Sequence, residues 1–227
     1  KYFGQKLNDN TILLSYDGIL SSGADSGVML IIENAEKLIQ NYGVQILITG
    51  KMTLSSHKNK EYIQQIEVLI NKYPHNFWAP NKEYHNDLLL IKYASDFGII
   101  PYINEGSSIH QHEYFISGTP VIAYKTGSLK DSVFEYNPLD KKGNGILFNE
   151  YDSNNFISAV IRAIKLFNNK LENDICRKNA YNSAMDVMDV ARAWATEFYR
   201  LQGKIFFDNK EVESATLEFN KNLEAKK

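Results

Sequence analysis

Two turns rich in glycine and small hydroxyl residues carry the chemistry that this sequence most clearly offers, the binding of an anion. The first reads PYINEGSS over residues 101–108 and contains Glu105, Gly106, Ser107 and Ser108 directly before a predicted helix. Free backbone N–H groups and the positive end of the helix dipole favour an anion there, and a glycine lets a ligand approach the backbone closely. Ser107 or Ser108 could also act simply as a helix cap.

The second turn has the same construction and follows the next predicted strand. It reads YKTGSLKDSV over residues 124–133, and a short helix is expected to begin within it. Its candidate binding residues are Lys125, Thr126, Gly127, Ser128 and Leu129. Successive backbone N–H groups in turns form concave anion sites, so two such turns at neighbouring strand ends would hold a diphosphate from both sides.

The longer segments around these turns resemble a known enzyme family. The segment EGSSIHQHEYFISGTP, residues 105–120, resembles the Glu-x7-Glu segment of retaining GT-B glycosyltransferases, with Glu105 and Glu113 as the two glutamates. The segment KTGSLKDSV, residues 125–133, resembles the Lys/Arg-Thr-Gly-Gly-Leu-x-Asp-Thr-Val signature of glycogen and starch synthases. Flanking matches that are less specific are ASDFGIIP at 94–101, GILF at 145–148 and WATEFYRL at 194–201.

The resemblance implies a donor site for a nucleotide sugar, ADP-glucose or UDP-glucose, without a metal or a separate cofactor. Glu105 would face the transferred glucose as the catalytic carboxylate, and Glu113 would reach the ribose. A carboxylate stabilises the oxocarbenium-like state of a retaining transfer, and fixed donors can meet the charge of the departing diphosphate. The donors implied by the resemblance are Gly106, Ser107, Ser108, Thr126, Gly127 and Ser128, next to Lys125 and Leu129.

One stretch departs from the family pattern. The family carries an arginine and a lysine after its first strand, whereas residues 16–27, YDGILSSGADSG, contain neither and include two aspartates. Each lost charge-assisted hydrogen bond can cost about 1.5–3 kcal/mol. Ser128 also replaces a family glycine. Either Lys51, Lys125 or Lys130 substitutes for the missing cations, or the donor site is inactive.

Two functions from different classes therefore remain open. The chain is either the donor-binding lobe of an active α-glucan synthase, whose acceptor lobe lies outside this sequence, or a non-catalytic scaffold or glucan- or nucleotide-binding lobe. A general nucleotide-binding module is a third, more distant reading. The Gly-x-Gly-x-x-Gly fingerprint is absent after the first predicted strand, which argues against NAD.

A small group of histidines invites a metal hypothesis. His110, His112 and Glu113 form an HxHE cluster. On a helix, residues two apart point about 200° away from each other, so the two histidines cannot easily share an ion. We therefore predict no metal site.

Short apolar runs alternate with helical patterns along the chain, which predicts βαβ units and a parallel sheet of about six strands. We expect a Rossmann-like, three-layer α/β/α domain over residues 11–201, one lobe of a GT-B fold, whose ligand lies beyond the carboxyl ends of the strands. The predicted strands are 11–16, 45–49, 76–79, 97–100, 120–123 and 145–148. The predicted helices are 27–42, 59–73, 84–93, 110–117 and two or three more between 154 and 201.

Composition narrows the remaining classes. The chain has 227 residues, 44% of them hydrophobic, and a net charge of −2, so no broad basic surface for nucleic acid is expected. No apolar run is long enough for a membrane helix, and the single cysteine is consistent with a reducing compartment, the cytoplasm or a plastid. Because the chain begins at Lys1, we expect a piece of a longer protein, with residues 1–10 as a lead-in and 202–227 as a helix-prone linker or tail.

Overall fold

The computed structural model divides the chain into two compact units, Lys1–Ala184 and Met185–Lys227. The residues whose structure is described are Phe3, 10–20, 26–52, 56–80, 88–104, Gly106 and 108–201. The first unit holds the sheet and seven of the helices below, and the second contributes one described helix. The predicted domain limits at residues 11 and 201 stay a prediction.

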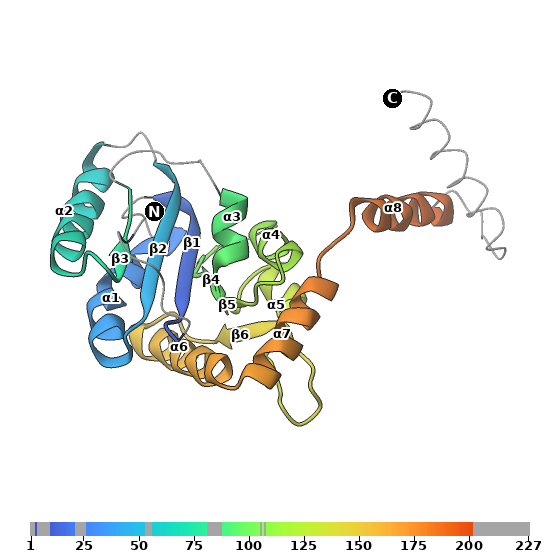
Figure 1. Ribbon diagram of the computed structural model, residues 1–227. Helices are drawn as coiled ribbons and strands as arrows, with labels where there is room; N and C mark the ends of the chain where they lie inside the picture. Colours follow the sequence, from blue (N-terminus) through green and yellow to red (C-terminus); the bar gives the residue numbers. More distant parts are fainter. Residues whose placement is uncertain are drawn as a thin grey trace. The chain divides into compact units, whose positions relative to one another are not determined.

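The first unit is built on a six-stranded sheet in the order β3-β2-β1-β4-β5-β6, with every neighbouring pair parallel (Figure 1). The predicted Rossmann-like α/β fold is thus confirmed. In this order the chain reverses its direction of travel across the sheet between β1 and β4, and ligands of such sheets bind in the crevice outside that point. The strands are β1 (Leu13–Leu20), β2 (Gln45–Met52), β3 (Phe77–Trp78), β4 (Phe97–Ile100), β5 (Val121–Tyr124) and β6 (Gly145–Phe148).

Helices cover both faces of this sheet. On one side α1 packs against α2 and α6, and on the other α4 packs against α3 and α7 (Figure 1). Their apolar faces bury residues such as Ile31, Leu38 and Phe156 against the strands. The helices are α1 (Val28–Tyr42), α2 (Ser56–Lys72), α3 (Leu88–Ala94), α4 (His110–Ile116), α5 (Leu129–Ser132), α6 (Ser153–Asn168) and α7 (Lys170–Asn182).

Strands β1 and β2 run further than the sequence predicts, which corrects two expectations. The prediction ended them at Tyr16 and Thr49 and treated Gly50 as a strand end, but pairing continues to Leu20 and Met52. Gly18 lies opposite Gly50, where a Cβ atom would stand 1.9 Å from the Gly18 carbonyl oxygen. Two glycines without side chains let the strands stay paired at this close approach.

Helix α4 is fixed to the sheet by Tyr114, and this fixes the orientation of the residues beside it. The Tyr114 ring lies against β4 where Gly98 leaves room, since a Cβ there would be 2.7 Å from the ring. Its hydroxyl lies 3.1 Å from the Ser15 hydroxyl and donates to the Ser15 carbonyl at 3.2 Å. These contacts join α4 to β1 directly beside the switch point of the sheet.

The second unit contributes helix α8 (Val187–Leu201). Its Trp194 and Phe198 rings lie 5.6 Å apart, and none of its residues is buried. Among the described helices, none is long and apolar enough to cross a membrane.

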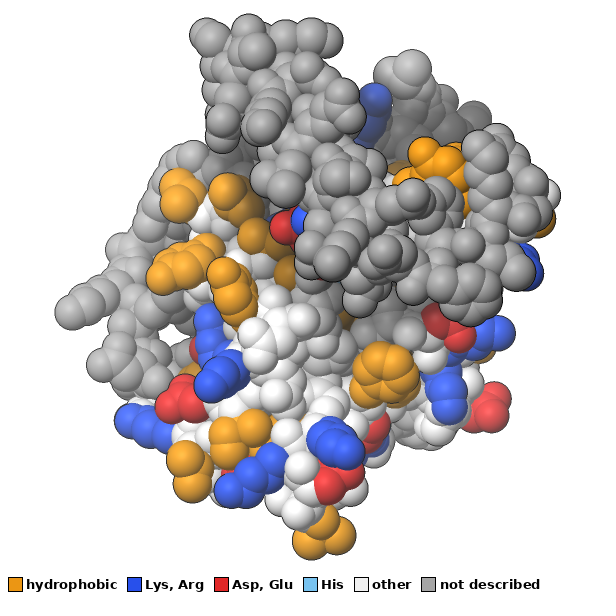
Figure 2. Space-filling view, turned by 90° about the vertical axis from the view of Figure 1, so that its right-hand side faces the viewer, with side chains coloured by type: hydrophobic (Ala, Val, Ile, Leu, Met, Phe, Trp, Pro, Cys, Tyr) orange, Lys and Arg blue, Asp and Glu red, His pale blue; other side chains and the backbone are white. Residues whose placement is uncertain are grey.

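On the face drawn in Figure 2, lysine and arginine side chains lie interspersed with acidic ones.

Candidate functional site

The two predicted turns meet at the carboxyl edge of the sheet, because they follow the neighbouring strands β4 and β5. The Ser108 backbone N–H donates to the Ser128 hydroxyl at 2.9 Å, and the Thr126 hydroxyl donates to the Ile103 carbonyl at 3.0 Å. Gly106 is exposed, with no atom within 4 Å of where a Cβ would stand. Glu105 and Ser107 lie outside the described residues, so their predicted roles stay predictions.

Each turn is held from within by its own helix. Gly127 takes a left-handed conformation with φ 45°, and Leu129 anchors the turn as a fully buried side chain. The Gln111 amide donates to the Ser108 carbonyl at 2.9 Å and to the Ser132 hydroxyl at 3.2 Å, which links both turns to α4. The described residues of the two turns are therefore held by contacts within the fold.

Polar atoms without partners lie at this junction. The Ser108 hydroxyl and the Gln111 side-chain oxygen are buried and have no hydrogen-bond partner among the described residues. Buried polar groups are normally paired in folded proteins, and an unpaired one calls for an explanation such as a bound ligand or water. The first turn therefore offers hydrogen-bonding capacity that the described part of the fold does not use.

A partly buried charge cluster, made of Asp17, Lys92, His110 and Glu113, lies at the switch point between β1 and β4. The Lys92 ammonium lies 2.8 Å from Asp17 Oδ2 and donates to Glu113 Oε2. Lys92 is only 4% exposed, and the Tyr114 ring lies beneath its ammonium at 5.5 Å. A buried ammonium is costly unless it is paired, and here it has two carboxylates.

Glu113 is the member of this cluster that the sequence had singled out. His110 Nδ1 lies 3.5 Å from Glu113 Oε2, the oxygen that also accepts from Lys92. The His110 ring and the Lys92 ammonium lower the pKa of the Glu113 carboxyl to about 2, against the opposing effect of its partial burial. Glu113 is therefore a carboxylate throughout the neutral range.

The two histidines of the HxHE pattern face different neighbours, as their spacing predicts. The His110 ring lies 5.5 Å from the Tyr102 ring, on the side of the charge cluster. The His112 ring packs against Phe115 at 6.0 Å, and burial lowers its pKa. They do not face a common ligand position.

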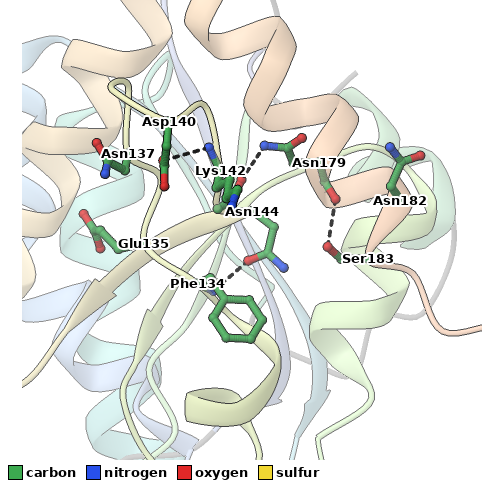
Figure 3. Close-up of a pocket in the computed structure, with 10 residues that line it drawn as sticks. Phe134, Glu135, Asn137, Asp140, Lys142, Asn144, Asn179, Asn182 and Ser183 are labelled. Atoms are coloured by element: carbon green, nitrogen blue, oxygen red, sulfur yellow. Dashed lines mark hydrogen bonds between the residues drawn. The ribbon is translucent and has the colours of Figure 1, made fainter.

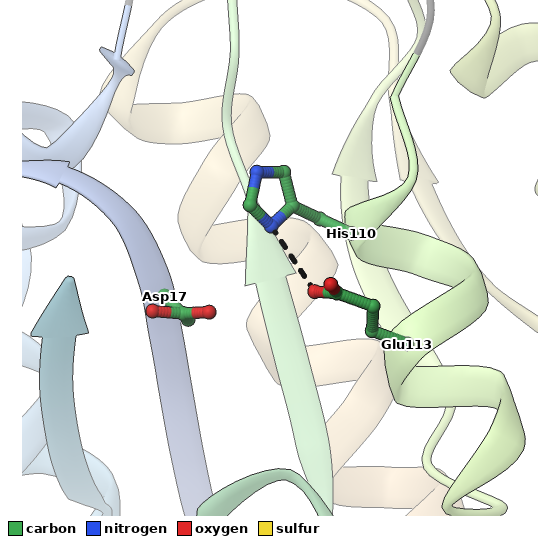
Figure 4. A group of neighbouring side chains, drawn as sticks. All are labelled: Asp17, His110 and Glu113. Carbon is green, nitrogen blue, oxygen red and sulfur yellow. Dashed lines mark ion pairs between the residues drawn. The ribbon is translucent and has the colours of Figure 1, made fainter. Parts of the chain in front are cut away.

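Asp17, His110 and Glu113 bring one possible metal-ligand atom each to within 4.8 Å of the others (Figure 4). Sequence reasoning had weighed His110 with His112 and did not find this group. The Lys92 ammonium already binds both carboxylates, so a protein cation holds the position between them. A divalent ion would have to displace it, and this donor set therefore does not fit a resident metal.

The three lysines predicted as substitute cations do not belong to the cluster. Lys125 and Lys130 are exposed beside the second turn. Lys51 is also exposed, but it lies within β2, where it pairs with Ile19 of β1. The prediction had put it in a loop after that strand. None of the three forms an ion pair with a described acidic residue.

Lys92 is the site residue that sequence reasoning missed. A weak signal was present, because Lys92 is the single charged residue in the helix LLLIKYA. A lone lysine in an apolar helix is ordinarily assigned to the solvent side. Nothing local in the sequence indicated that this helix turns its lysine inward, toward an aspartate on β1.

A hollow of about 590 Å³, lined mainly by polar side chains, lies elsewhere on the first unit, against the loop before β6 (Figure 3). The amide side chains in its wall already hold the loop together. Asn144 accepts from the Phe134 N–H at 2.8 Å, and Asn179 donates to the Lys141 and Gly143 carbonyls at 2.9 and 3.0 Å. These bonds support Lys141 in a left-handed conformation, with φ 57°. The hollow is best explained as loop architecture.

Comparison with known proteins agrees with the fold. The family model described as "Glycosyl transferases group 1" matches residues 19–183. The glycogen synthase of Petrotoga mobilis is 32% identical over 77% of this chain and 34% of its own length. That of Acholeplasma laidlawii is 28% identical over 90% of this chain and 41% of its own length.

Solved structures show the same architecture at lower identity. The catalytic domain of starch synthase IV from Arabidopsis thaliana, bound to ADP and acarbose, superimposes with a TM-score of 0.70 at 23% identity, covering 87% of this chain and 39% of that one. HepE from Anabaena, in complex with UDP, gives a TM-score of 0.64 at 16% identity, covering 84% and 49%. The fold is that of a GT-B glycosyltransferase lobe.

This chain belongs to the group 1 glycosyltransferase family, and its similarity to glycogen synthases supports glycosyltransferase function. The chain spans about a third of the length of the first curated relatives that it matches. The activity of a whole protein is accordingly a matter for proposal.

Proposed function

We propose that this chain is the donor-binding lobe of a retaining glucosyltransferase that transfers glucose from ADP-glucose or UDP-glucose to an α-1,4-glucan. The observation that carries the proposal is the junction of the two turns at the carboxyl edge, where Ser108 bonds to Ser128 and Thr126 to the Ile103 carbonyl. Neutral backbone and hydroxyl donors meet there on adjacent strands, which suits a diphosphate. Glycogen synthases among the relatives support the choice of glucan.

Within this proposal the residues keep the roles that the family resemblance implies. Glu105 stabilises the oxocarbenium-like transition state, and Glu113 meets the ribose. Gly106, Ser107, Ser108, Thr126, Gly127 and Ser128 bind the diphosphate or the sugar. Two structural neighbours, one bound to ADP and the other to UDP, leave the nucleotide base open.

The alternative is a degenerate lobe that binds a glucan or a nucleotide, or acts as a scaffold, without catalysis. It is favoured by one observation, the absence of arginine and lysine from the sequence of residues 16–27, which cover the end of β1 and the segment after it. Asp17 belongs to this stretch and is paired with Lys92. Such a site would bind a departing diphosphate less well, because this stretch supplies no cation.

Calorimetric titration of ADP-glucose and UDP-glucose into this chain tests the proposal. Saturable binding of at least one of them below millimolar concentration is expected. Thr126→Val should weaken it, since the variant breaks the bond between the turns, whereas Thr126→Ser retains the hydroxyl and serves as the matched control. If neither nucleotide sugar binds at millimolar concentration, the donor-site proposal fails.

We expect no glucosyl transfer by this chain alone. In GT-B enzymes the reaction takes place in the cleft between two lobes, and the sequence accounts for one. The check is a radiolabelled transfer assay with a glucan acceptor, run beside an active glycogen synthase. Turnover by the isolated chain would contradict the expectation that both lobes are needed for the reaction.

A further inference from the structure

Helix α3 exposes several of its apolar residues and buries its lysine. Its apolar residues Leu89, Leu90 and Tyr93 are 65%, 66% and 69% exposed, whereas its lysine, Lys92, is 4% exposed. Lysine is among the residues least often buried, and its ammonium loses hydration when it is. An inward lysine on an outwardly apolar helix therefore needs a specific set of partners, and α3 is positioned so that Lys92 reaches them.

Those partners come from other elements of the fold. Asp17 on β1 binds the ammonium at 2.8 Å and is itself 3.4 Å from the Thr49 hydroxyl of β2. Glu113 on α4 binds it from the opposite side, and the Thr119 hydroxyl donates to the Lys92 carbonyl at 2.8 Å. Lys92 is thus fixed at its backbone and at its charge.

The contacts of Glu113 are unequal between its two oxygens. Both Lys92 and His110 approach Oε2, and no described residue donates a hydrogen bond to Oε1. The Glu113 side chain is 40% exposed, so a ligand can reach it while Oε2 is held by the protein. A carboxylate held in this way is oriented for a ligand, because its remaining lone pairs point in a fixed direction.

We propose that Lys92 is a positioning residue for the donor nucleotide: it holds Oε2 of Glu113 so that Oε1 accepts a hydrogen bond from a ribose hydroxyl. Lys92 itself does not touch the nucleotide. The inference rests on the proposed function, in which Glu113 meets the ribose. Asp17 is the second partner of the Lys92 ammonium, which is therefore paired with a carboxylate from β1 as well as with Glu113.

The test compares UDP and ADP with their 2′,3′-dideoxy forms by calorimetry. In the wild type, removal of the ribose hydroxyls should weaken binding roughly tenfold to a hundredfold, as expected for a hydrogen bond to a charged group. In Lys92→Met the ratio of the two dissociation constants should fall below about threefold, because Glu113 is no longer held. The ratio is the informative quantity, since any general loss of diphosphate affinity affects both nucleotides alike.

Two further variants make the result decisive. Asp17→Asn combined with Lys92→Met removes both buried charges together, so that no lone aspartate is left buried, and it should show the same loss of ribose preference. Lys72→Met is the matched control: Lys72 pairs with Glu36 at 2.5 Å on the exposed faces of α2 and α1, and its loss should leave the ratio unchanged.

The outcomes separate the inference from the function on which it rests. If the double variant folds by circular dichroism and keeps the wild-type ribose preference, Lys92 does not position Glu113, while the donor site stands. If wild-type protein binds both ribose and dideoxyribose forms equally, the contact between Glu113 and ribose is absent and the inference is overturned. If the wild type binds no form of either nucleotide, the proposed function falls, and the inference with it.

Discussion

Helix α4 joins the turns after β4 and β5 to the charge cluster, and these two regions are built in opposite ways. The turns consist of neutral hydroxyl and backbone donors, contributed by two short segments that resemble family motifs. The cluster consists of charges from three elements far apart in sequence, and its Asp17 belongs to the stretch 16–27, which lacks the arginine and lysine that the family resemblance implies. The affinity of this chain for a donor nucleotide therefore has to come mainly from the two neutral turns.

The cations missing from the segment around Asp17 are not replaced in charge by a lysine from another element. Residues 16–20 contain no lysine or arginine, yet an ammonium lies beside Asp17, because α3 supplies Lys92 from another part of the chain. This ammonium faces two carboxylates, so the three side chains together carry a negative charge. Lys92 therefore does not make up for the missing cations in charge, and it cannot by itself neutralise a diphosphate.

The largest expected effect comes from breaking the cluster. Lys92→Met leaves Asp17 buried without its partner, and removal of one member of a buried pair costs about 3–5 kcal/mol of unfolding free energy. Asp17→Asn together with Lys92→Met should recover most of this loss. Urea denaturation monitored by circular dichroism measures both. A loss below about 1 kcal/mol in the single variant would show that the pair is solvated like a surface salt bridge.

The second-largest effect is expected from the lysines beside the two neutral turns. If Lys125 or Lys130 meets the diphosphate, its replacement by alanine should weaken donor binding by up to a few kcal/mol, as for a lysine about 4 Å from a phosphate in a partly wet cleft. Stability should hardly change, because both side chains are exposed. Lys51→Ala is the third member of the series, and calorimetry with ADP-glucose and UDP-glucose provides the measurement. Unchanged affinity in all three variants would exclude them as substitutes for the family cations.

A smaller effect is expected from the bond that joins the turns. Thr126→Val removes the hydrogen bond to the Ile103 carbonyl and should lower the free energy of unfolding by about 1 kcal/mol, with Thr126→Ser close to wild type. Thermal denaturation of the three proteins side by side gives the comparison. Equal stability of the valine and serine variants would mean that the turns are held by packing alone.

The smallest effect is a pH dependence that originates in Glu113. Its folded-state pKa of about 2 lies below the ordinary value of 4.5, so its ion pairs stabilise the fold above pH 4.5, and this contribution is lost as the pH falls toward 2. Glu113→Gln should flatten that part of the stability profile. Because the side chain is 40% exposed, solvent screens the effect. Parallel profiles for the two proteins would contradict the assigned pairing.

The sequence predicted what depends on local pattern. Strands over 97–100 and 145–148 match the structure, and the two turns lie side by side because β4 and β5 are neighbours. Apolar periodicity and glycine-rich turns are local signals, and they can be recognised in the sequence before the sheet is assembled.

What the sequence did not predict depends on contacts between distant segments. Strands β1 and β2 extend beyond their predicted ends because Gly18 meets Gly50, a pairing visible only once the sheet is assembled. Lys92 faces Asp17 because α3 packs beside β1, although its own segment reads as an apolar helix with an exposed lysine. Buried charge pairs of this kind leave no periodic signal, and only the fold brings their members together.

A crystal structure of this chain with ADP or UDP bound tests the donor site most directly. We expect the diphosphate within hydrogen-bond distance of Ser108 and of the turn around Thr126, with a ribose hydroxyl on Glu113 Oε1. Lys92 should still be paired with Asp17 and Glu113. A nucleotide seated away from both turns, or a Glu113 that leaves Lys92 without contacting the ribose, would contradict this expectation.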